Sequence, residues 1–440
     1  MSTQAFRGRL LDFQDDPATA PSGRAHRYIE DGLLVVEDGL VAEAGATAEL
    51  RKRHGSDLEI VDHRPHLLLP GFIDAHIHLP QTRVIASYGA QLLDWLDKYT
   101  FIEEARFADP AHAAHAAAFF LDELLRCGTT TAAVFGSVHR TSIEALFGES
   151  ARRNTRMIAG KVLMDRNAPE ELRDSAEAGA RDTAALIDQW HGKGRQLYAI
   201  TPRFAITSSE AQLEAAGDLL AAHPSCYLQT HLAENRLEID TVAALFTWAK
   251  DYTDVYDRYG LLGRNSLFGH CIHLEERELQ RLHESGSVAV HCPTSNLFIG
   301  SGLFDLARLS AAPRPLRIAI ATDVGGGTSY SMLRTLAESY KVLQLQGQNL
   351  PALDGFYQIT LGNARALGLE GTIGSFVPGA EADFVVLDSA STPASAHRME
   401  TVEGLEEELF VLMTLGDERA VRATYVMGEC QHAQAARLTA

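Results

Sequence analysis

Short apolar segments alternate with amphipathic segments through the middle of the chain, and this alternation constrains the fold more than any other feature. The apolar segments are GFIDAHI, TTTAAVFG, RMIAGKVLM, QLYAITPRF, CYLQTHLA, SLFGHCI, SVAVHCP and RIAIATDVG. Such near-continuous apolar runs are typical of strands that are buried on both faces of a parallel sheet. Stretches such as AHAAAFFLDELLRC and SMLRTLAESYKVLQL repeat apolar residues at helical spacing between them. We therefore predict an α/β fold with a (β/α)8 barrel of the TIM type.

A doubly wound open sheet is the alternative arrangement of alternating strands and helices. That fold binds nucleotides through a GxGxxG turn directly after the first strand. The turn in this chain reads AHIHLPQT and contains no glycine. The barrel is therefore favoured.

The two ends of the chain have a different pattern, with short alternating strands and Gly or Asp at the turns. The first end contains RGRLLDF, DGLLVVEDGLVAEAG and LEIVD, and the last contains TIGSFVPGAEADFVVLD and RATYVMGEC. We predict that both ends pair into one small β-sandwich-like domain beside the barrel. The predicted boundaries are 1–68 for the first part, 69–370 for the barrel, and 371–440 for the second part and tail.

Charge and cysteine content exclude several classes of protein. The 39 Lys and Arg residues against 58 Asp and Glu residues give a net charge of −19, which disfavours nucleic acid and anionic membranes as partners. The five cysteines form no CxxC pair, which argues against a disulfide framework or a cysteine-ligated zinc site. The N-terminus lacks an apolar signal region, and no segment is apolar enough to span a bilayer. We predict a cytoplasmic protein with a small-molecule substrate.

Polar residues stand at the ends of four of the predicted barrel strands. His76 and His78 end the first strand, His231 the fifth, His270 the sixth and Asp323 the eighth. A barrel places its active site at the carboxyl ends of its strands, so these side chains should meet at one rim.

Three histidines and an aspartate at one rim are sufficient to hold a catalytic metal ion. Each has another explanation on its own: His76 and His78 as polar residues at a strand exit, His231 as a core histidine, and Asp323 as a helix N-cap. Their joint placement favours the metal site. Zinc is the predicted ion, and iron is the alternative because a set of histidine and carboxylate ligands binds both.

Two further residues beside the predicted ligands suit proton chemistry. Glu234 follows His231 by three residues and can act as a proton shuttle, although a carboxylate in the first turn of a helix is its competing explanation. His270 could be a fifth metal ligand. We favour a role beside the metal, stabilising the attacking water and the developing oxyanion, because four protein ligands and a water already fill the coordination sphere.

A second metal ion is not expected. Lys161 is predicted inside the third strand rather than at its rim, and the fourth strand offers no lysine that could bridge two metals. The HLE sequence at His273 matches half of a cysteine-ligated zinc deaminase motif, but no PCxxC follows it. We therefore predict one metal ion per chain.

The segment LPQTRVIASYGAQLLDWLDKYTFIEEARF after the first strand exceeds the usual βα loop length. It could cover the pocket and exclude water, with Trp95 and Tyr99 as candidates. Because these two residues are one helical turn apart, a short amphipathic helix packed on the barrel is the favoured explanation for them.

Several motifs together resemble the amidohydrolase superfamily of metal-dependent hydrolases. They are PGFIDAHIHLPQ, TPRFAITSS, QTHLAEN, GHCIHL, HCPTSNLFIGSGLF and TDVGGGTSYSMLRT, and GAEADFVVLD is similar to a C-terminal β-domain strand of the same superfamily. The resemblance covers about Leu69 to Val342. The HxH pair is shared across the superfamily, whereas TPRF, HLAEN and TDVGGGTS are similar to the narrower group of members that act on guanine.

The resemblance implies that zinc is held by four ligands, which match His76, His78, His231 and Asp323. It also implies a purine-binding role for Gln81, Arg203 and Phe204, whose amide, guanidinium and ring suit an oxopurine. The implied reaction is the hydrolysis of guanine to xanthine and ammonia in purine catabolism, with Glu234, Asp323 and His270 as catalytic residues. Another aminoheterocycle, such as 8-oxoguanine or cytosine, is the alternative substrate, and a homodimer is the expected assembly.

Overall fold

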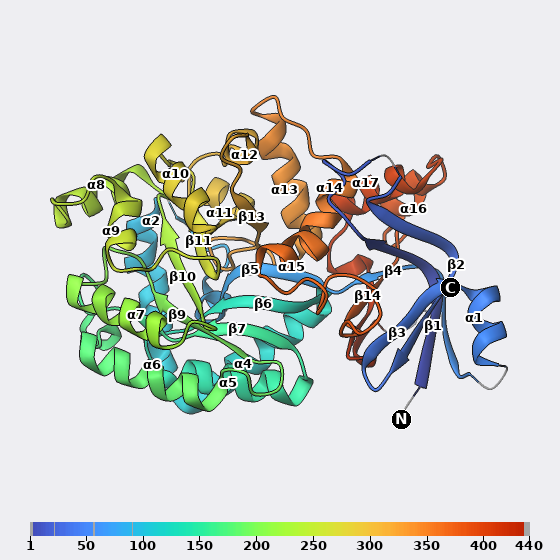
Figure 1. The fold of residues 1–440 in the computed structure, drawn as a ribbon, viewed down its shortest axis with the longest axis horizontal. Coiled ribbons are helices and arrows are strands. Elements are labelled where there is room, and N and C mark those ends of the chain that lie inside the picture. The colour runs from blue at the N-terminus through green and yellow to red at the C-terminus, as the bar shows by residue number, and fades with distance from the viewer. Residues whose placement is uncertain (1–2, 22, 56–57, 90, 435–440) are drawn as a thin grey trace.

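The computed structural model describes residues 3–21, 23–55, 58–89 and 91–434. A parallel barrel lies beside a small β domain, and the first and last strands of the chain belong to that domain (Figure 1). Both the (β/α)8 barrel and the β domain built from both termini are confirmed. None of the helices in the described parts combines the length and apolar character needed to cross a bilayer.

The barrel strands follow the predicted apolar segments in order. They are β5 (Phe72–His78), β6 (Thr129–Phe135), β7 (Arg156–Gly160), β9 (Leu197–Pro202), β10 (Tyr227–Leu232), β11 (Ser266–His270), β12 (Val288–His291) and β13 (Arg317–Ile320), with the short β8 (Val162–Leu163) paired to β9. Neighbouring strands pair in parallel. One buried apolar cluster collects residues from several of these strands, including Ile73, Ala133, Ile158 and Val288. The strands that carry the polar residues at their ends are therefore also packed together by apolar side chains.

Helices lie around the barrel, and the longer ones bury apolar residues along one face. They are α4 (Pro110–Arg126), α5 (Arg140–Arg153), α6 (Ala176–Trp190), α7 (Glu210–Ala222), α8 (Arg236–Leu245), α9 (Tyr252–Arg258), α10 (Glu276–Ser285), α11 (Pro293–Phe298), α12 (Leu306–Ser310), α13 (Met332–Gln344), α14 (Ala352–Tyr357) and α15 (Asn363–Ala366). In α4, the Asp109 side chain accepts a hydrogen bond from the Ala111 amide and Pro110 starts the helix. Its Ala113, Ala117 and Phe120 are buried, as the periodicity predicts.

The β domain is one mixed sheet of seven strands. Its order is β16 (Glu429–Ala433), β15 (Val421–Val426), β14 (Phe384–Leu387), β4 (Ile60–Pro70), β1 (Thr3–Phe13), β2 (His26–Glu37) and β3 (Leu40–Ala46), with α1 (Thr47–His54), α16 (Pro393–Met399) and α17 (Leu405–Leu415) beside it. The chain passes from β4 of this sheet into β5 of the barrel at Gly71. We keep 68/69 and 370/371 as proposed domain boundaries.

A buried ion cluster joins the two domains. Arg195 donates to Glu381 at 2.6 Å and to Asp383 at 2.5 Å, and Arg156 also binds Glu381. The arginines belong to the barrel and the carboxylates lie next to β14.

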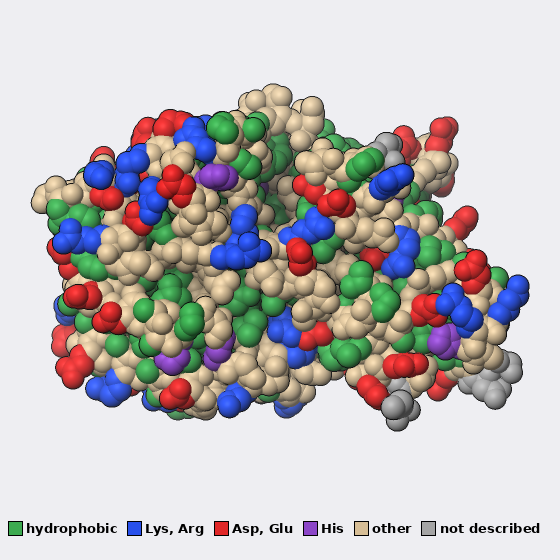
Figure 2. Space-filling view, viewed as in Figure 1, with side chains coloured by type: hydrophobic (Ala, Val, Ile, Leu, Met, Phe, Trp, Pro, Cys, Tyr) green, Lys and Arg blue, Asp and Glu red, His purple; other side chains and the backbone are tan. Residues whose placement is uncertain are grey.

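On the face of the molecule in Figure 2, Lys and Arg side chains lie dispersed among Asp and Glu rather than gathered in one patch.

Candidate active site

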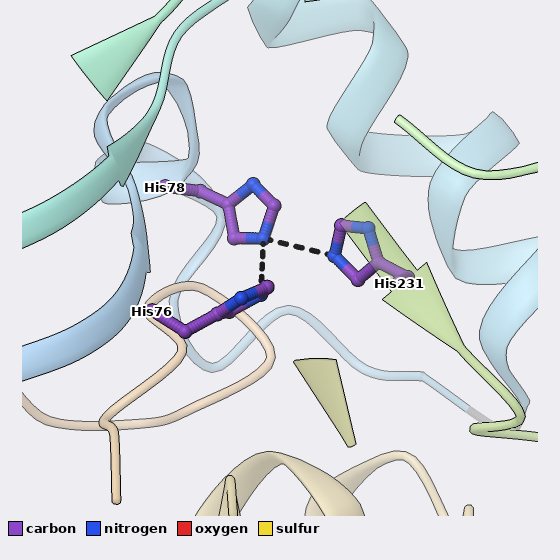
Figure 3. Close-up of side chains that lie close together, drawn as sticks. All are labelled: His76, His78 and His231. Atoms are coloured by element: carbon purple, nitrogen blue, oxygen red, sulfur yellow. Dashed lines mark hydrogen bonds between the residues drawn. The ribbon is translucent and has the colours of Figure 1, made fainter. Parts of the chain in front are cut away.

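Three predicted ligands converge at the rim of the barrel. His76 and His78 end β5, and His231 lies on β10. The Nε2 atom of His78 is 3.3 Å from Nε2 of His76 and 3.3 Å from Nε2 of His231 (Figure 3). All three rings are buried or nearly so.

Asp323 completes this group from the loop after β13. Its Oδ1 atom lies 3.2 Å from Nε2 of His78 and 3.4 Å from Nε2 of His76. The residue has a φ of 51°, an uncommon conformation for aspartate that is typical of functional sites, and its amide donates to the His76 carbonyl at 2.9 Å. Helix α13 begins only at Met332, with Ser331 as its N-cap, so Asp323 does not cap a helix.

The donor atoms fit a metal ion. Ligand bonds of about 2.0–2.2 Å at tetrahedral angles place donor atoms about 3.3–3.6 Å apart, which agrees with the spacing of these nitrogens and the carboxylate. Burial lowers the pKa of His78 to about 3 and lowers that of His231 well below its usual value, so both present lone pairs. The Nδ1 of His231 lies 2.7 Å from the Arg203 carbonyl, which fixes its proton there and leaves Nε2 free for a metal. Two overlapping groups, one of His76, His78 and His231 and one of His76, His270 and Asp323, have the proximity that metal binding requires.

A small residue beneath the cluster makes room for His76. A Cβ atom on Gly269 of β11 would lie 2.7 Å from Cε1 of His76, which is shorter than side chains tolerate. The backbone of β11 can therefore approach the imidazole only where the side chain is absent.

Side chains close the barrel beneath the metal-binding residues. Strands β5 and β13 are the two ends of the barrel sheet, and no backbone ladder joins the two strands in the described residues. Beyond the end of β13, the Asp323 amide donates to the His76 carbonyl and the His78 amide donates to the Val324 carbonyl, each at 2.9 Å. The buried Asp74 carboxylate accepts hydrogen bonds from the amide of His76, from the Thr322 amide at 3.1 Å and from the Thr322 hydroxyl. Asn363 donates to the carbonyls of Ile73 and Ile320 at 2.7 and 2.8 Å. Asp74 therefore fixes the backbone beside a predicted ligand on each strand.

Asp74→Asn should weaken metal binding by about 10- to 100-fold, the usual effect of losing a residue that orients ligands. The asparagine amide would place a donor opposite the amide and hydroxyl donors of Thr322, so the β13 end would shift. Competition with a chelator measures the affinity. Asp62→Asn, at an exposed position on β4, is the matched control, and an unchanged affinity in Asp74→Asn would contradict the role.

Glu234 points into the same space. It precedes the N-cap Asn235 of α8, so it lies outside the first helical turn, where Glu238 forms the capping box instead. Its Oε1 accepts from the Ser301 hydroxyl at 2.7 Å, and its Oε2 lies 3.4 Å from Nε2 of His270. Burial and the charge of Asp323 raise the pKa of Glu234 to about 8, against the opposing effect of the Ser301 hydrogen bond. A carboxyl group in this environment can carry a proton near neutral pH.

His270 lies between the carboxylates. Its Nε2 is 3.4 Å from Glu234 and 3.7 Å from Oδ2 of Asp323, while Nδ1 lies 2.8 Å from Oδ1 of Asn296. The residue adopts a φ of 72°, which turns its ring from the end of β11 toward the rim. Asn296 therefore holds the Nδ1 proton and orients Nε2 toward the site.

One pocket collects the substrate-binding candidates and the cluster. Its wall residues are His78, Gln81, Leu92, Trp95, Leu96, Arg203, Phe204, His231, Glu234, His270, Ile299, Asp323 and Gly326. His76 lies directly beside it, so the structure brings together all nine residues predicted for the site.

The long segment after β5 forms one wall of this pocket. It contains one continuous helical run, in which α2 (Leu92–Trp95), a π-helical stretch (Leu96–Thr100) and α3 (Phe101–Ala105) follow one another directly. Trp95 lines the pocket and donates to the Ser87 carbonyl at 3.3 Å. Tyr99 is only partly buried and packs against the barrel core, as the amphipathic helix predicts. Trp95 therefore forms part of the pocket wall, whereas Tyr99 packs against the core.

Lys161 is placed differently from the prediction. It follows the end of β7, in the break before β8, rather than inside a strand. Its ammonium group binds the Asp174 carboxylate at 2.6 Å, and it does not line the pocket. The carboxylate partner offsets the cost of burying the ammonium group.

Four supporting residues were missed by sequence reasoning: Glu104, Asp74, Asn296 and Ser301. Asp74 was detectable as a carboxylate in an otherwise apolar strand, and Asn296 and Ser301 lie in the HCPTSNLFIGSGLF motif. Glu104 carries no such signal because it is one of two adjacent glutamates in a helical segment. Its side chain is fully buried and binds Arg203 at 2.7 Å.

Comparisons with known proteins agree with this geometry. Residues 67–430 match the model of the amidohydrolase family. The chain is 48% identical to the guanine deaminase of Escherichia coli (strain K12) over 428 residues, covering 97% of each chain. It resembles the crystal structure of guanine deaminase from Bradyrhizobium japonicum with a TM-score of 0.94 and 38% identity, covering 99% of this chain and 100% of that one. Guanine deaminase from C. acetobutylicum with bound guanine in the active site is 26% identical with a TM-score of 0.86, covering 98% and 100%. The chain therefore belongs to the amidohydrolase family, a family of metal-dependent hydrolases.

Proposed function

We propose that this chain catalyses the zinc-dependent hydrolysis of guanine to xanthine and ammonia. The observation that carries the proposal is one pocket in which the His and Asp cluster faces a buried glutamate and an arginine–glutamine pair. Relatives that are 48% and 41% identical to this chain are named guanine deaminase and probable guanine deaminase, and a solved structure that is 38% identical is named guanine deaminase, which supports guanine over the alternative aminoheterocycles.

His76, His78, His231 and Asp323 would hold one zinc ion. When bound, zinc lowers the pKa of a coordinated water and so supplies a hydroxide nucleophile near neutral pH. Nitrogen and carboxylate donors with buried, neutral histidines suit zinc and also iron, and zinc is the ion that we propose.

Glu234 moves protons to the substrate. It would protonate N3 of guanine, which makes C2 electrophilic, and would later protonate the departing amine so that ammonia leaves. Both protons come from the water: Glu234 would take the first as the hydroxide forms, and Asp323 would accept the second and return it through Glu234 to the departing amine. His270 would stabilise the developing oxyanion from its place beside the cluster, where its Nε2 lies between the carboxylates of Glu234 and Asp323 and its Nδ1 faces Asn296.

The pocket wall binds the purine. Phe204 offers an apolar face beside His231, with ring centroids 6.4 Å apart. Gln81 and Arg203 present polar groups for the oxygen and nitrogen atoms of the ring. Leu92, Trp95 and Leu96 cover the pocket and keep bulk water from the reaction.

Ammonia release from guanine by purified, metal-analysed protein tests the proposal, with xanthine identified as the product. Adenine, cytosine and 8-oxoguanine serve as comparison substrates. Guanine-selective release with about one zinc per chain is the expected result. Bound metal without ammonia release from guanine would reject the proposal. Ammonia release from another base would show that the assignment of the substrate-binding residues is wrong and that of the metal site is not.

We further propose that the protein is a cytoplasmic homodimer, on the basis of its resemblance to related barrels. Light scattering coupled to size-exclusion chromatography measures the assembly. A monomer at working concentration would reject the dimer without affecting the proposed reaction.

A further inference from the structure

A buried carboxylate stands behind the two polar substrate-binding candidates. Glu104, on α3, has a fully buried side chain. Both of its oxygens accept from Nη1 of Arg203, at 2.8 and 2.7 Å, and Oε1 is also 3.4 Å from Nε2 of Gln81. The backbone carbonyl of Glu104 accepts from the Ser137 hydroxyl at 3.0 Å, which holds this end of α3 against the barrel.

These contacts decide which atoms remain for a ligand. Arg203 uses Nη1 on Glu104, and no other hydrogen bond of its guanidinium group is found in the described residues, so Nη2 and Nε are left to donate. The Gln81 amide is held at both ends, because Nε2 faces Glu104 and Oε1 accepts from the Gly325 amide at 3.1 Å. The amide therefore cannot turn without placing its NH2 group against a backbone donor.

The polar wall of the pocket consequently presents N–H donors. A carbonyl oxygen with a neighbouring ring nitrogen, as on the O6 and N7 edge of guanine, accepts from such donors. An amino group in the same position would face donors and leave them unpaired, and a site built for hydrogen bonding rejects such a mismatch strongly.

We propose that Glu104 is the residue that sets this polarity and so makes the pocket select a purine with an oxo group at C6 over one with an amino group. The inference rests on the proposed function. Glu104 does not line the pocket, so it acts through Arg203 and Gln81 as a positioning residue. It also links the segment that covers the pocket to the barrel residue that faces the substrate, since α3 carries Glu104 and Arg203 follows β9.

Glu104→Gln tests this role with little change in shape. A neutral amide would bind Arg203 more weakly and would remove the carboxylate that Nε2 of Gln81 faces, so the donors on the pocket wall would no longer be held in place. Binding is measured by calorimetry on the zinc-loaded protein with hypoxanthine and adenine, which differ at C6 and lack the 2-amino group that would react. We expect the wild type to prefer hypoxanthine by about 100-fold or more, and the variant to lose at least about tenfold of that preference.

Turnover gives a second readout. Guanine and 2,6-diaminopurine share the 2-amino leaving group, so their ratio of kcat/KM reports recognition at C6. In Glu104→Gln this ratio should fall by about tenfold or more, mainly through a higher KM for guanine. Zinc content should stay at the wild-type level, because Glu104 does not contact the His and Asp cluster in the structure.

Glu103→Gln is the matched control. The neighbouring Glu103 binds Arg106 at 2.9 Å and His112 at 3.3 Å on the other side of the segment, so its loss should leave both ratios unchanged. Glu104→Asp, which keeps the carboxylate, should retain more of the hypoxanthine preference than Glu104→Gln, and it also serves if Glu104→Gln fails to fold.

The two proposals fail in different ways. A wild type that turns over guanine, paired with a Glu104→Gln variant of unchanged preference, would overturn the role of Glu104 alone. A folded Glu104→Asp with less preference than Glu104→Gln would also overturn it. The wild type could also show no activity on guanine and still prefer hypoxanthine over adenine. If Glu104→Gln then loses this preference, the result would support the role of Glu104 and reject the proposed reaction.

Discussion

Glu234→Gln should keep its zinc and lose turnover of guanine by about 10³-fold, within the usual range for removing a general acid–base group. The glutamine is isosteric and can still accept from Ser301, so the pocket should keep its shape. It cannot deliver a proton to N3 or to the departing amine. Stopped and continuous assays of ammonia release measure kcat, and metal analysis of the same sample measures zinc.

Glu210→Gln is the matched control for this prediction. Glu210 stands in the first turn of α7, after β9, and is exposed, so it shares the charge and the strand-to-helix location of Glu234 without facing the pocket. Its variant should turn over guanine at the wild-type rate. Wild-type kcat in Glu234→Gln would remove the shuttle role.

His78→Ala should lose the metal and reduce activity by about 10³-fold or more, because a catalytic zinc needs three or four protein ligands. His78 lies at the centre of the cluster, because its Nε2 is 3.2–3.3 Å from donor atoms of His76, His231 and Asp323. Metal analysis after dialysis should find less than about one tenth of an equivalent in the variant. Removing the metal from the wild type with a chelator should abolish turnover, and zinc should restore more activity than iron.

The control for His78→Ala is His291→Gln. His291 also ends a barrel strand and is buried, but its ring stacks on Phe304 and its nitrogens find no hydrogen-bond partner in the described residues. This variant should retain stoichiometric zinc. A His78→Ala protein with a full equivalent of tightly bound metal would exclude His78 as a ligand.

The fold was largely predictable because its signals are local. A strand buried on both faces is apolar along its whole length, and a helix that covers the barrel repeats apolar residues at the helical period. Both patterns can be recognised within a short stretch of consecutive residues. The break between β7 and β8 was not predicted, and the carboxylate that Lys161 binds beside it, Asp174, lies thirteen residues later in the chain.

The candidate ligands were also predictable, for a geometric reason. Parallel barrel strands end at one rim, so His76, His231 and Asp323, far apart in the chain, must approach one another once the strand order is known. Alternative explanations of single residues were removed only by the structure. Asp323 is not an N-cap, and Glu234 precedes α8 rather than lying in its first turn.

The sequence by itself determined the barrel, its rim and the kinds of atom that the rim presents, because periodicity and strand order depend on consecutive residues. Only the tertiary structure decided how those atoms are held. Asp74 and Asn363 join the barrel ends, and Glu104 orients Arg203 and Gln81 from a separate segment. These contacts link residues that are 23 to 290 positions apart in the sequence. Such a hydrogen bond produces no periodic sequence pattern, because it depends on where two segments of backbone meet in space.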